Sequence, residues 1–166
     1  MGKEIFHGKD SREKLLKGVN ELANAVRVTL GPRGRNVIIE RDGTPHITKD
    51  GVTVAKAVEF SDSAVNLGAQ IIKEASQQTA DHAGDGTTTS TVLAQHIFNE
   101  GMKAVEAGAN PIELYRGMQI SVKEIVKHLV DNVSLNVKTN EAIKNIATIS
   151  ANGDSEIGSI IAEAIG

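Results

Sequence analysis

The apolar positions of this chain recur mostly with the spacing of an amphipathic helix. The first such stripe consists of Leu15, Val19, Leu22, Ala23 and Val26. Asp10 followed by Glu13 predicts a capping box at the start of this helix, with Asp in the Ser/Thr role. We expect the helix to run from this box to Thr29 or Leu30.

A short β element is predicted next. Residues 36–40 read as a strand, Asp42-Gly43 is a turn signal, and residues 46–48 form the return strand. A lone two-stranded hairpin is marginal in water. Only residues 3–6 remain as a candidate third strand, so the hairpin is expected to need partners that this chain does not obviously provide.

Further helices account for most of the remaining chain. Asn110, Pro111 and Glu113 form a helix-start signal, with Asn at the N-cap. The apolar stripe of that helix is Leu114, Met118, Ile125 and Leu129. The other helices are expected at about residues 53–58, 63–79, 140–146 and 154–165, with a break at 134–138. A further helix is expected after the GDGTTT segment, reaching about residue 106. The predicted class is therefore mainly α with one small β-hairpin.

Composition excludes several classes of protein. The chain has 166 residues, a net charge of −3 and no cysteine, so it has no basic footprint for nucleic acid and no thiolate metal site. No apolar run is long enough to cross a membrane, and the first six residues lack the core of a signal peptide. These features favour a bacterial-type cytoplasmic protein that binds neither nucleic acid nor membrane.

The most informative segment is residues 81–91. A Gly-Asp-Gly turn at residues 84–86 runs into five consecutive hydroxyl side chains and then an apolar helical segment. A helix N-terminus offers backbone N–H groups and a positive dipole end to phosphate, and glycines let the backbone approach it. Asp85 adds a hard oxygen ligand for Mg²⁺. The segment predicts a Mg-nucleotide cradle; the alternative is a capped helix start with a threonine-rich first turn.

Two further segments carry similar chemistry. In residues 29–36, Gly31 is a natural residue after a helix end and Pro32 forbids continuation, so a simple helix stop is the alternative. In residues 47–53, Lys49 and Asp50 stand beside a glycine, and a plain turn is the alternative.

Six segments together resemble one family. They are TLGPRGRN, ITKDGVTVA, NLGAQ, AGDGTTTSTVLA, EAGANPIELYRGM and ATISAN, in that order. The chain is similar to group I chaperonins, the GroEL-type large subunit, over essentially its whole length. The resemblance implies a chaperonin equatorial-domain fold for residues 1–134, the N-terminal half of that domain, and the beginning of the intermediate domain for residues 135–166. The apical domain would be absent from this sequence.

The resemblance also implies a nucleotide site for ATP. The residues that would bind or line the nucleotide are Thr29, Leu30, Gly31, Pro32, Lys49, Asp85, Gly86, Thr87, Thr88 and Thr89. Asp85 would hold Mg²⁺. Thr29 and Lys49 would help to hold K⁺ through backbone oxygens. Asp50 would be catalytic and orient the attacking water, because phosphoryl transfer depends mainly on positioning and charge neutralisation.

The function implied for the full-length subunit is ATP-dependent folding of unfolded proteins inside a homo-oligomeric ring. A co-chaperonin lid and unfolded proteins would be partners through the missing apical domain. The 166 residues alone are expected to be an N-terminal fragment that is hydrolytically incomplete, because the intermediate-domain aspartate lies outside them. The alternatives are a truncated, non-catalytic ring-interaction module and an unrelated small phosphotransferase, for which we find neither a base nor an acceptor site.

Overall fold

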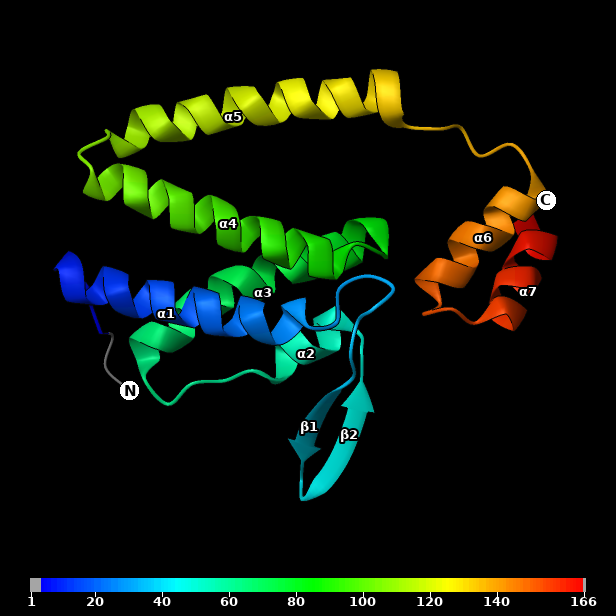
Figure 1. The fold of residues 1–166 in the computed structure, drawn as a ribbon, viewed down its shortest axis with the longest axis horizontal. Coiled ribbons are helices and arrows are strands. Elements are labelled where there is room, and N and C mark those ends of the chain that lie inside the picture. Colours follow the sequence, from blue (N-terminus) through cyan, green and yellow to red (C-terminus); the bar gives the residue numbers. More distant parts are fainter. Residues whose placement is uncertain (1–3, 166) are drawn as a thin grey trace. The chain divides into compact units, whose positions relative to one another are not determined.

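The computed structural model describes residues 4–165, which divide into two compact units at residues 100 and 101. The first unit holds α1 (Gly8–Arg27), β1 (Val37–Arg41), β2 (Thr44–Thr48), α2 (Gly51–Ala57), α3 (Ser63–Ala83) and most of α4 (Thr87–Glu106), as Figure 1 shows. The second unit holds the end of α4, α5 (Pro111–His128), the π-helical turn η1 (Leu129–Val133), α6 (Asn140–Ser150) and α7 (Ser155–Ile165). The predicted class, mainly α with a small β-hairpin, is confirmed.

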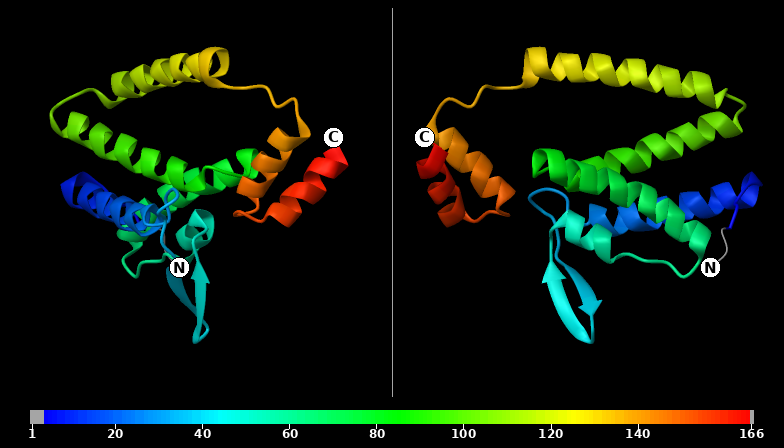
Figure 2. Two further views of the ribbon diagram at one scale, coloured as in Figure 1. Left: turned by 45° about the vertical axis from the view of Figure 1, so that its right-hand side comes forward. Right: turned by 180° about the vertical axis from the view of Figure 1, so that it is seen from behind.

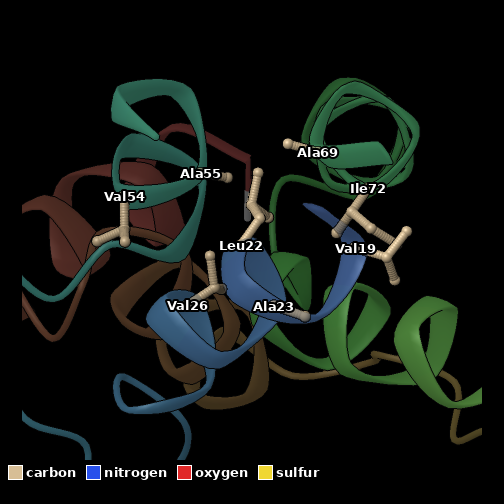
Figure 3. Close-up of a cluster of buried hydrophobic side chains, with 8 residues drawn as sticks. All are labelled: Val19, Leu22, Ala23, Val26, Val54, Ala55, Ala69 and Ile72. Atoms are coloured by element: carbon tan, nitrogen blue, oxygen red, sulfur yellow. The ribbon is translucent and has the colours of Figure 1, made fainter. Parts of the chain in front are cut away.

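The core of the first unit is aliphatic and lies between three helices. Its members are Val19, Leu22, Ala23 and Val26 of α1, Val54 and Ala55 of α2, and Ala69 and Ile72 of α3 (Figure 3). The apolar stripe predicted for α1 supplies half of this cluster. The side chains of Val19, Leu22 and Val26 are fully buried, because helical spacing puts them on one face of α1.

Two glycines allow α1 and α3 to pack very closely. A Cβ added to Gly18 would lie 1.9 Å from the carbonyl oxygen of Val65, and one added to Gly68 would lie 2.1 Å from that of Leu15. Each helix thus presents a glycine where the backbone of the other passes. Figure 1 shows α1 lying across α3.

The hairpin pairs β1 and β2 in an antiparallel register in which Val37 faces Thr48. Asp42 and Gly43 both have positive φ, of 52° and 77°, which is the backbone that a two-residue hairpin turn requires. The hairpin projects from the helices of its unit (Figure 2). Its cross-strand pair Ile38 and Ile47 is 70% and 61% exposed, so one apolar face of the hairpin has no cover.

The prediction of a third strand is wrong for the residues that can be judged. Residues 4–6 are not in a strand, and within residues 4–165 the sheet contains only β1 and β2. Lys3, with which the candidate strand began, lies outside the described residues.

In the second unit, α6 and α7 pack against each other around Gly158. A Cβ added there would lie 2.0 Å from the hydroxyl oxygen of Thr148. The predicted helix start at Asn110 is confirmed, because its side chain accepts a hydrogen bond of 2.9 Å from the Ile112 amide. The predicted break at 134–138 is also confirmed as non-helical chain. Helix α5 buries none of its residues.

Several helix ends differ from the predictions. The first helix begins at Gly8 with His7 at the N-cap, so the Asp10 capping box is wrong, and it ends at Arg27 rather than at residue 29 or 30. Beyond Arg27 the chain winds more tightly than an α-helix, because the amides of Thr29 and Leu30 donate to the carbonyl oxygens three residues back instead of four. Other bounds differ by one to four residues: α2 spans residues 51–57, α3 ends at 83, α6 ends at 150 and α7 begins at 155. The strands span residues 37–41 and 44–48 rather than 36–40 and 46–48.

Candidate functional site

The chain that follows α1 forms a tight loop. Its first residue, Thr29, is buried, and the Thr29 hydroxyl donates to the Val26 carbonyl oxygen at 2.8 Å. Because α1 ends at Arg27 and Val28 is its C-cap, Gly31, with φ +70°, is not the residue directly after the helix but a turn residue further along. At Gly34 a Cβ would lie 2.2 Å from the Thr29 carbonyl oxygen. The glycines therefore bring the loop back onto the end of α1.

Asp50 caps the start of α2. Its Oδ2 atom accepts from the Thr53 amide at 3.0 Å and from the Thr53 hydroxyl. The Asp50 amide in turn donates to the Thr48 hydroxyl oxygen at 3.1 Å. The structure thus shows the local bonding that the turn interpretation of Asp50 describes, while a catalytic role for the same carboxyl group stays a prediction. Lys49, next to it, is exposed.

Two glycines with positive φ lead into α4. Gly84 ends α3 in the left-handed conformation with φ 71°, and Gly86 has φ 83°. Between them Asp85 is exposed. The turn that the Gly-Asp-Gly sequence predicts is therefore present, and the hydroxyl run occupies the first turn of the helix, starting at Thr87.

The five hydroxyls of this run divide into three groups. Ser90 and Thr91 donate back to the Thr87 carbonyl oxygen at 2.9 and 2.8 Å, so they serve the helix itself. The Thr88 hydroxyl meets that of Thr29 at 3.2 Å. Within residues 4–165, the hydroxyls of Thr87 and Thr89 have no protein partner.

Thr88 is the point at which the three predicted segments meet. Besides its contact with Thr29, it lies against Gly51, where an added Cβ would come within 2.2 Å of the Thr88 hydroxyl oxygen. The same Cβ would lie 3.3 Å from the Val26 side chain. The end of α1, the start of α2 and the start of α4 therefore converge, although 59 residues separate Thr29 from Thr88.

The donors at this point suit a magnesium-bound phosphate. Gly86 has no side chain with which to cap α4, so it leaves the N-terminus of a 20-residue helix open to another acceptor. The unpartnered hydroxyls of Thr87 and Thr89 add two donors, and the exposed Asp85 carboxylate adds one hard oxygen. A single carboxylate fits Mg²⁺ that is held mainly by phosphate oxygens and water. For K⁺ at Thr29 and Lys49 the assignment stays a prediction.

Two features of the site were not foreseen from the sequence. One is the contact of Gly51 with Thr88, which a glycine directly after an N-cap residue could have suggested. The other is a set of polar side chains that joins α1 to α4, centred on Gln95, which is 4% exposed. Its signal is the helical spacing of Asn20, Asn24 and Arg27.

The comparison with protein families decides what kind of chain this is. Residues 22–166 match the model of the TCP-1/cpn60 chaperonin family. The chain belongs to this family. The resemblance drawn from the six sequence motifs is thereby confirmed at the family level, and the assignment to the group I, GroEL-type branch is consistent with it.

Two solved structures extend the comparison to the fold. Both are crystal structures of the chaperonin gp146 from the bacteriophage EL 2 (Pseudomonas aeruginosa) in the presence of ATP-BeFx, in crystal forms II and I. Each is 28% identical to this chain, with a TM-score of 0.76, and covers 95% of it. The match supports the chaperonin equatorial-domain fold. The chain spans 28% of the length of these chaperonins.

Two other features are absent from residues 4–165. No group of three or more His, Cys, Asp or Glu side chains is placed to hold a metal ion. No helix in the same range is long and apolar enough to cross a membrane.

Proposed function

We propose that this chain is the nucleotide-binding part of a chaperonin subunit, with the phosphates of Mg-bound ATP placed against the start of α4. The observation that carries the proposal is the meeting of Thr29, Gly51 and Thr88 at that helix end. A helix N-terminus preceded by glycine stabilises anions through its amides and dipole. The gp146 structures were determined in the presence of ATP-BeFx, which supports the same class of ligand here.

In this proposal the start of α4 holds the phosphates. The amides and hydroxyls of residues 87–89 donate to phosphate oxygens, and Gly86 lets the backbone come close to them. Asp85 provides a protein oxygen for Mg²⁺, which neutralises charge on the transferring phosphoryl group when it is bound. The nucleotide is lined by Leu30, Gly31 and Pro32. Backbone oxygens of Thr29 and Lys49 hold K⁺.

Asp50 can combine two roles because its two carboxylate oxygens differ. Oδ2 is engaged by Thr53, whereas Oδ1 accepts no hydrogen bond from residues 4–165. The cap fixes the orientation of the carboxyl group, and the second oxygen stays available to orient a water molecule for attack. Positioning of this kind is what phosphoryl transfer requires of the protein.

Assembly into a ring is the second part of the proposal. The apolar side chains of Ile38 and Ile47 on the hairpin are exposed, and helix α5 has no buried residue. Exposed apolar surface of this kind is typical of protein–protein interfaces. We assign the hairpin to contacts with a neighbouring subunit of a homo-oligomeric ring. In the same proposal, residues 1–134 belong to the equatorial domain and residues 135–166 to the intermediate domain. The full-length subunit folds unfolded proteins with a co-chaperonin lid, and it is located in the cytoplasm.

A non-catalytic ring-interaction module is the second candidate. It is favoured by the same exposed apolar side chains, together with the engagement of Asp50 as a helix cap. The two candidates differ in one measurement on the unsubstituted protein. Assembly without any Mg-dependent ATP turnover would identify the interaction module, whereas turnover would identify the ATPase.

The experiment that tests the site is the substitution Asp85→Ala in the full-length protein. We expect it to abolish Mg-dependent ATP hydrolysis, because the only protein ligand proposed for the metal is lost. Asp81→Ala is the matched control, since Asp81 is exposed and pairs with Gln77 on α3, at 2.6 Å, rather than with the site. Undiminished turnover in the Asp85 variant would refute the assignment.

A further inference from the structure

The contact between α1 and α4 contains a chain of polar side chains. Arg27 donates from Nη2 to the Gln95 Oε1 atom at 2.7 Å. The Gln95 Nε2 atom donates to the Oδ1 atoms of Asn20 and Asn24, at 2.7 and 3.2 Å. Asn99 also donates to Asn20 Oδ1, at 2.9 Å. Three residues of α1 and two of α4 are thus joined by four hydrogen bonds.

Only one arrangement of these amides allows all four bonds, and it leaves the buried Asn99 Oδ1 atom without a partner among the described residues. Arg27 can only donate, so it requires the oxygen of the Gln95 amide on its side. The Gln95 nitrogen then faces Asn20 and Asn24, whose oxygens must accept. Gln95 is 4% exposed, and its amide makes one bond through oxygen and two through nitrogen. A buried amide satisfied in this way is costly to displace.

These bonds define the lengthwise alignment of the two helices. Aliphatic contacts alone tolerate a sliding displacement, because dispersion has little directionality, whereas hydrogen bonds need both distance and angle. A slip of α4 by one helical turn, about 5.4 Å, would break every bond of Gln95. Buried polar residues are known to specify register between helices in this way.

The alignment matters because the same two helices build the proposed phosphate site. Gln95 lies seven residues after Thr88, two helical turns along the same face of α4. Arg27 lies two residues before Thr29 at the end of α1. The position of Gln95 along α1 therefore fixes the distance at which Thr29 and Thr88 meet, which is 3.2 Å between hydroxyl oxygens.

We propose that Gln95 is a positioning residue for the phosphate site. It does not touch the nucleotide; through Asn20, Asn24 and Arg27 it holds the first turn of α4 against the end of α1. The inference rests on the proposed function for its consequence, nucleotide affinity, but its geometric part can be measured without nucleotide.

The geometric test uses a disulfide reporter. The 166 residues contain no cysteine, so Thr29→Cys with Thr88→Cys, in a full-length protein freed of any other cysteine, introduces a single pair of thiols. With Gln95→Met added, we expect their effective concentration to fall about tenfold, the factor that corresponds to about 1.4 kcal/mol. Gln95→Glu should restore it, because the carboxylate accepts from Arg27 and the amides of Asn20 and Asn24 can turn to donate. Asn99 turns with them, so that its unpartnered Oδ1 atom accepts from Asn20. Gln77→Met on α3 is the matched control and should change nothing.

The second arm measures Mg·ATP affinity of the same Gln95 and Gln77 variants with the threonines in place. Weaker binding by Gln95→Met, rescued by Gln95→Glu, supports the inference. Val19→Ala, a core change on α1, controls for a general loss of stability and should leave affinity unchanged once the protein is folded. If the disulfide forms equally well in the Gln95→Met variant, the inference is overturned whatever the nucleotide result. It is also overturned if the disulfide forms less readily but the variant keeps its full affinity for Mg·ATP. If the unsubstituted protein binds no Mg·ATP, the proposed function fails, and the disulfide arm still decides the alignment.

Discussion

The hydroxyl oxygen of Thr29 lies 3.2 Å from that of Thr88, which joins the end of α1 to the first turn of α4. The Thr29 hydroxyl also donates to the Val26 carbonyl oxygen. In the contact between the two threonines, Thr29 must therefore accept, and the Thr88 hydroxyl donates. Without nucleotide the Thr88 hydroxyl therefore links the two helices, and in the proposed complex it turns from Thr29 to donate to a phosphate oxygen.

Replacing Thr88 by Val should separate these contributions. The side chains have similar shape, and only a neutral hydrogen bond is lost, so we expect the free energy of unfolding to fall by about 1 kcal/mol. Mg·ATP affinity should fall about tenfold or more, because hydrogen bonds to charged groups are stronger. Thr88→Ser keeps the hydroxyl and should retain most of the affinity. Urea unfolding and calorimetric titration of both variants check this; equal affinity of the Val and Ser variants would contradict it.

The glycine contact between α1 and α3 predicts a substitution of unusual cost. Alanine is the better helix former, but at Gly18 its Cβ would lie 1.9 Å from a backbone oxygen and 2.9 Å from a backbone nitrogen. We expect Gly18→Ala to lower the free energy of unfolding by about 2 kcal/mol, in the range of overpacked cores. The control is Gly117→Ala on α5, where an added Cβ would have no described atom within 4 Å apart from the neighbouring backbone of its own helix. That change should raise stability by up to about 1 kcal/mol. If both substitutions changed the free energy of unfolding in the same direction, this account of the packing would be contradicted.

Asp50 offers a clean separation of its structural and catalytic roles. Asn is as good an N-cap as Asp, so Asp50→Asn should keep the thermal midpoint of unfolding, whereas Asp50→Ala should lose about 1 kcal/mol of stability. If the charge orients the attacking water, both variants should lose turnover, by about 10²–10³-fold, while Mg·ATP binding largely survives. Full turnover in Asp50→Asn would leave the carboxyl group with the cap as its only role.

The ion pair between Lys14 and Asp62 predicts a pH dependence of stability. Lys14 Nζ lies 3.0 Å from Asp62 Oδ2, while Oδ1 caps α3. The hydrogen bond from Lys14 lowers the pKa of Asp62, and the hydrogen bond to Asp62 raises the pKa of Lys14. The contribution of Asp62 is thus present above its unfolded pKa of about 3.9 and disappears as the pH falls through its lower folded value.

The contribution of Lys14 is present below its unfolded pKa of about 10.4 and disappears as the pH rises through its higher folded value. Asp62→Asn keeps the cap of α3 and removes the pair. The stability difference between this variant and the parent should therefore shrink towards both pH extremes. Urea midpoints across pH check this, and the effect should be small because both side chains are exposed. A difference that stays constant down to about pH 2 would contradict it.

The sequence predicts those parts of the fold that depend on near neighbours. The stripe of α1 and the cap at Asn110 were correct because each rests on side chains within a few residues of one another. The Asp10 capping box failed because the chain enters the helix earlier, which puts Asp10 inside the first turn, where its charge still favours the helix dipole.

Contacts between distant segments are what the sequence pattern does not supply. The three segments of the site were each recognised from their glycines and hydroxyls, but nothing local to them requires Gly51 to lie against Thr88. The bond between Asn20 and Gln95 spans 75 residues. Helical spacing shows that each helix has a polar stripe, whereas the identity of the facing helix depends on the packing of the whole unit.

Amide hydrogen exchange with and without Mg·ATP tests the central claim most directly. If the phosphates bind where α1, α2 and α4 converge, the nucleotide should slow amide exchange in three segments together: residues 29–34, 50–54 and 86–90. The largest change should occur at the start of α4. The hairpin and α5 provide internal references that should not change on binding. Protection in all three segments is the result we predict. Binding of Mg·ATP without protection of residues 86–90 would contradict the account.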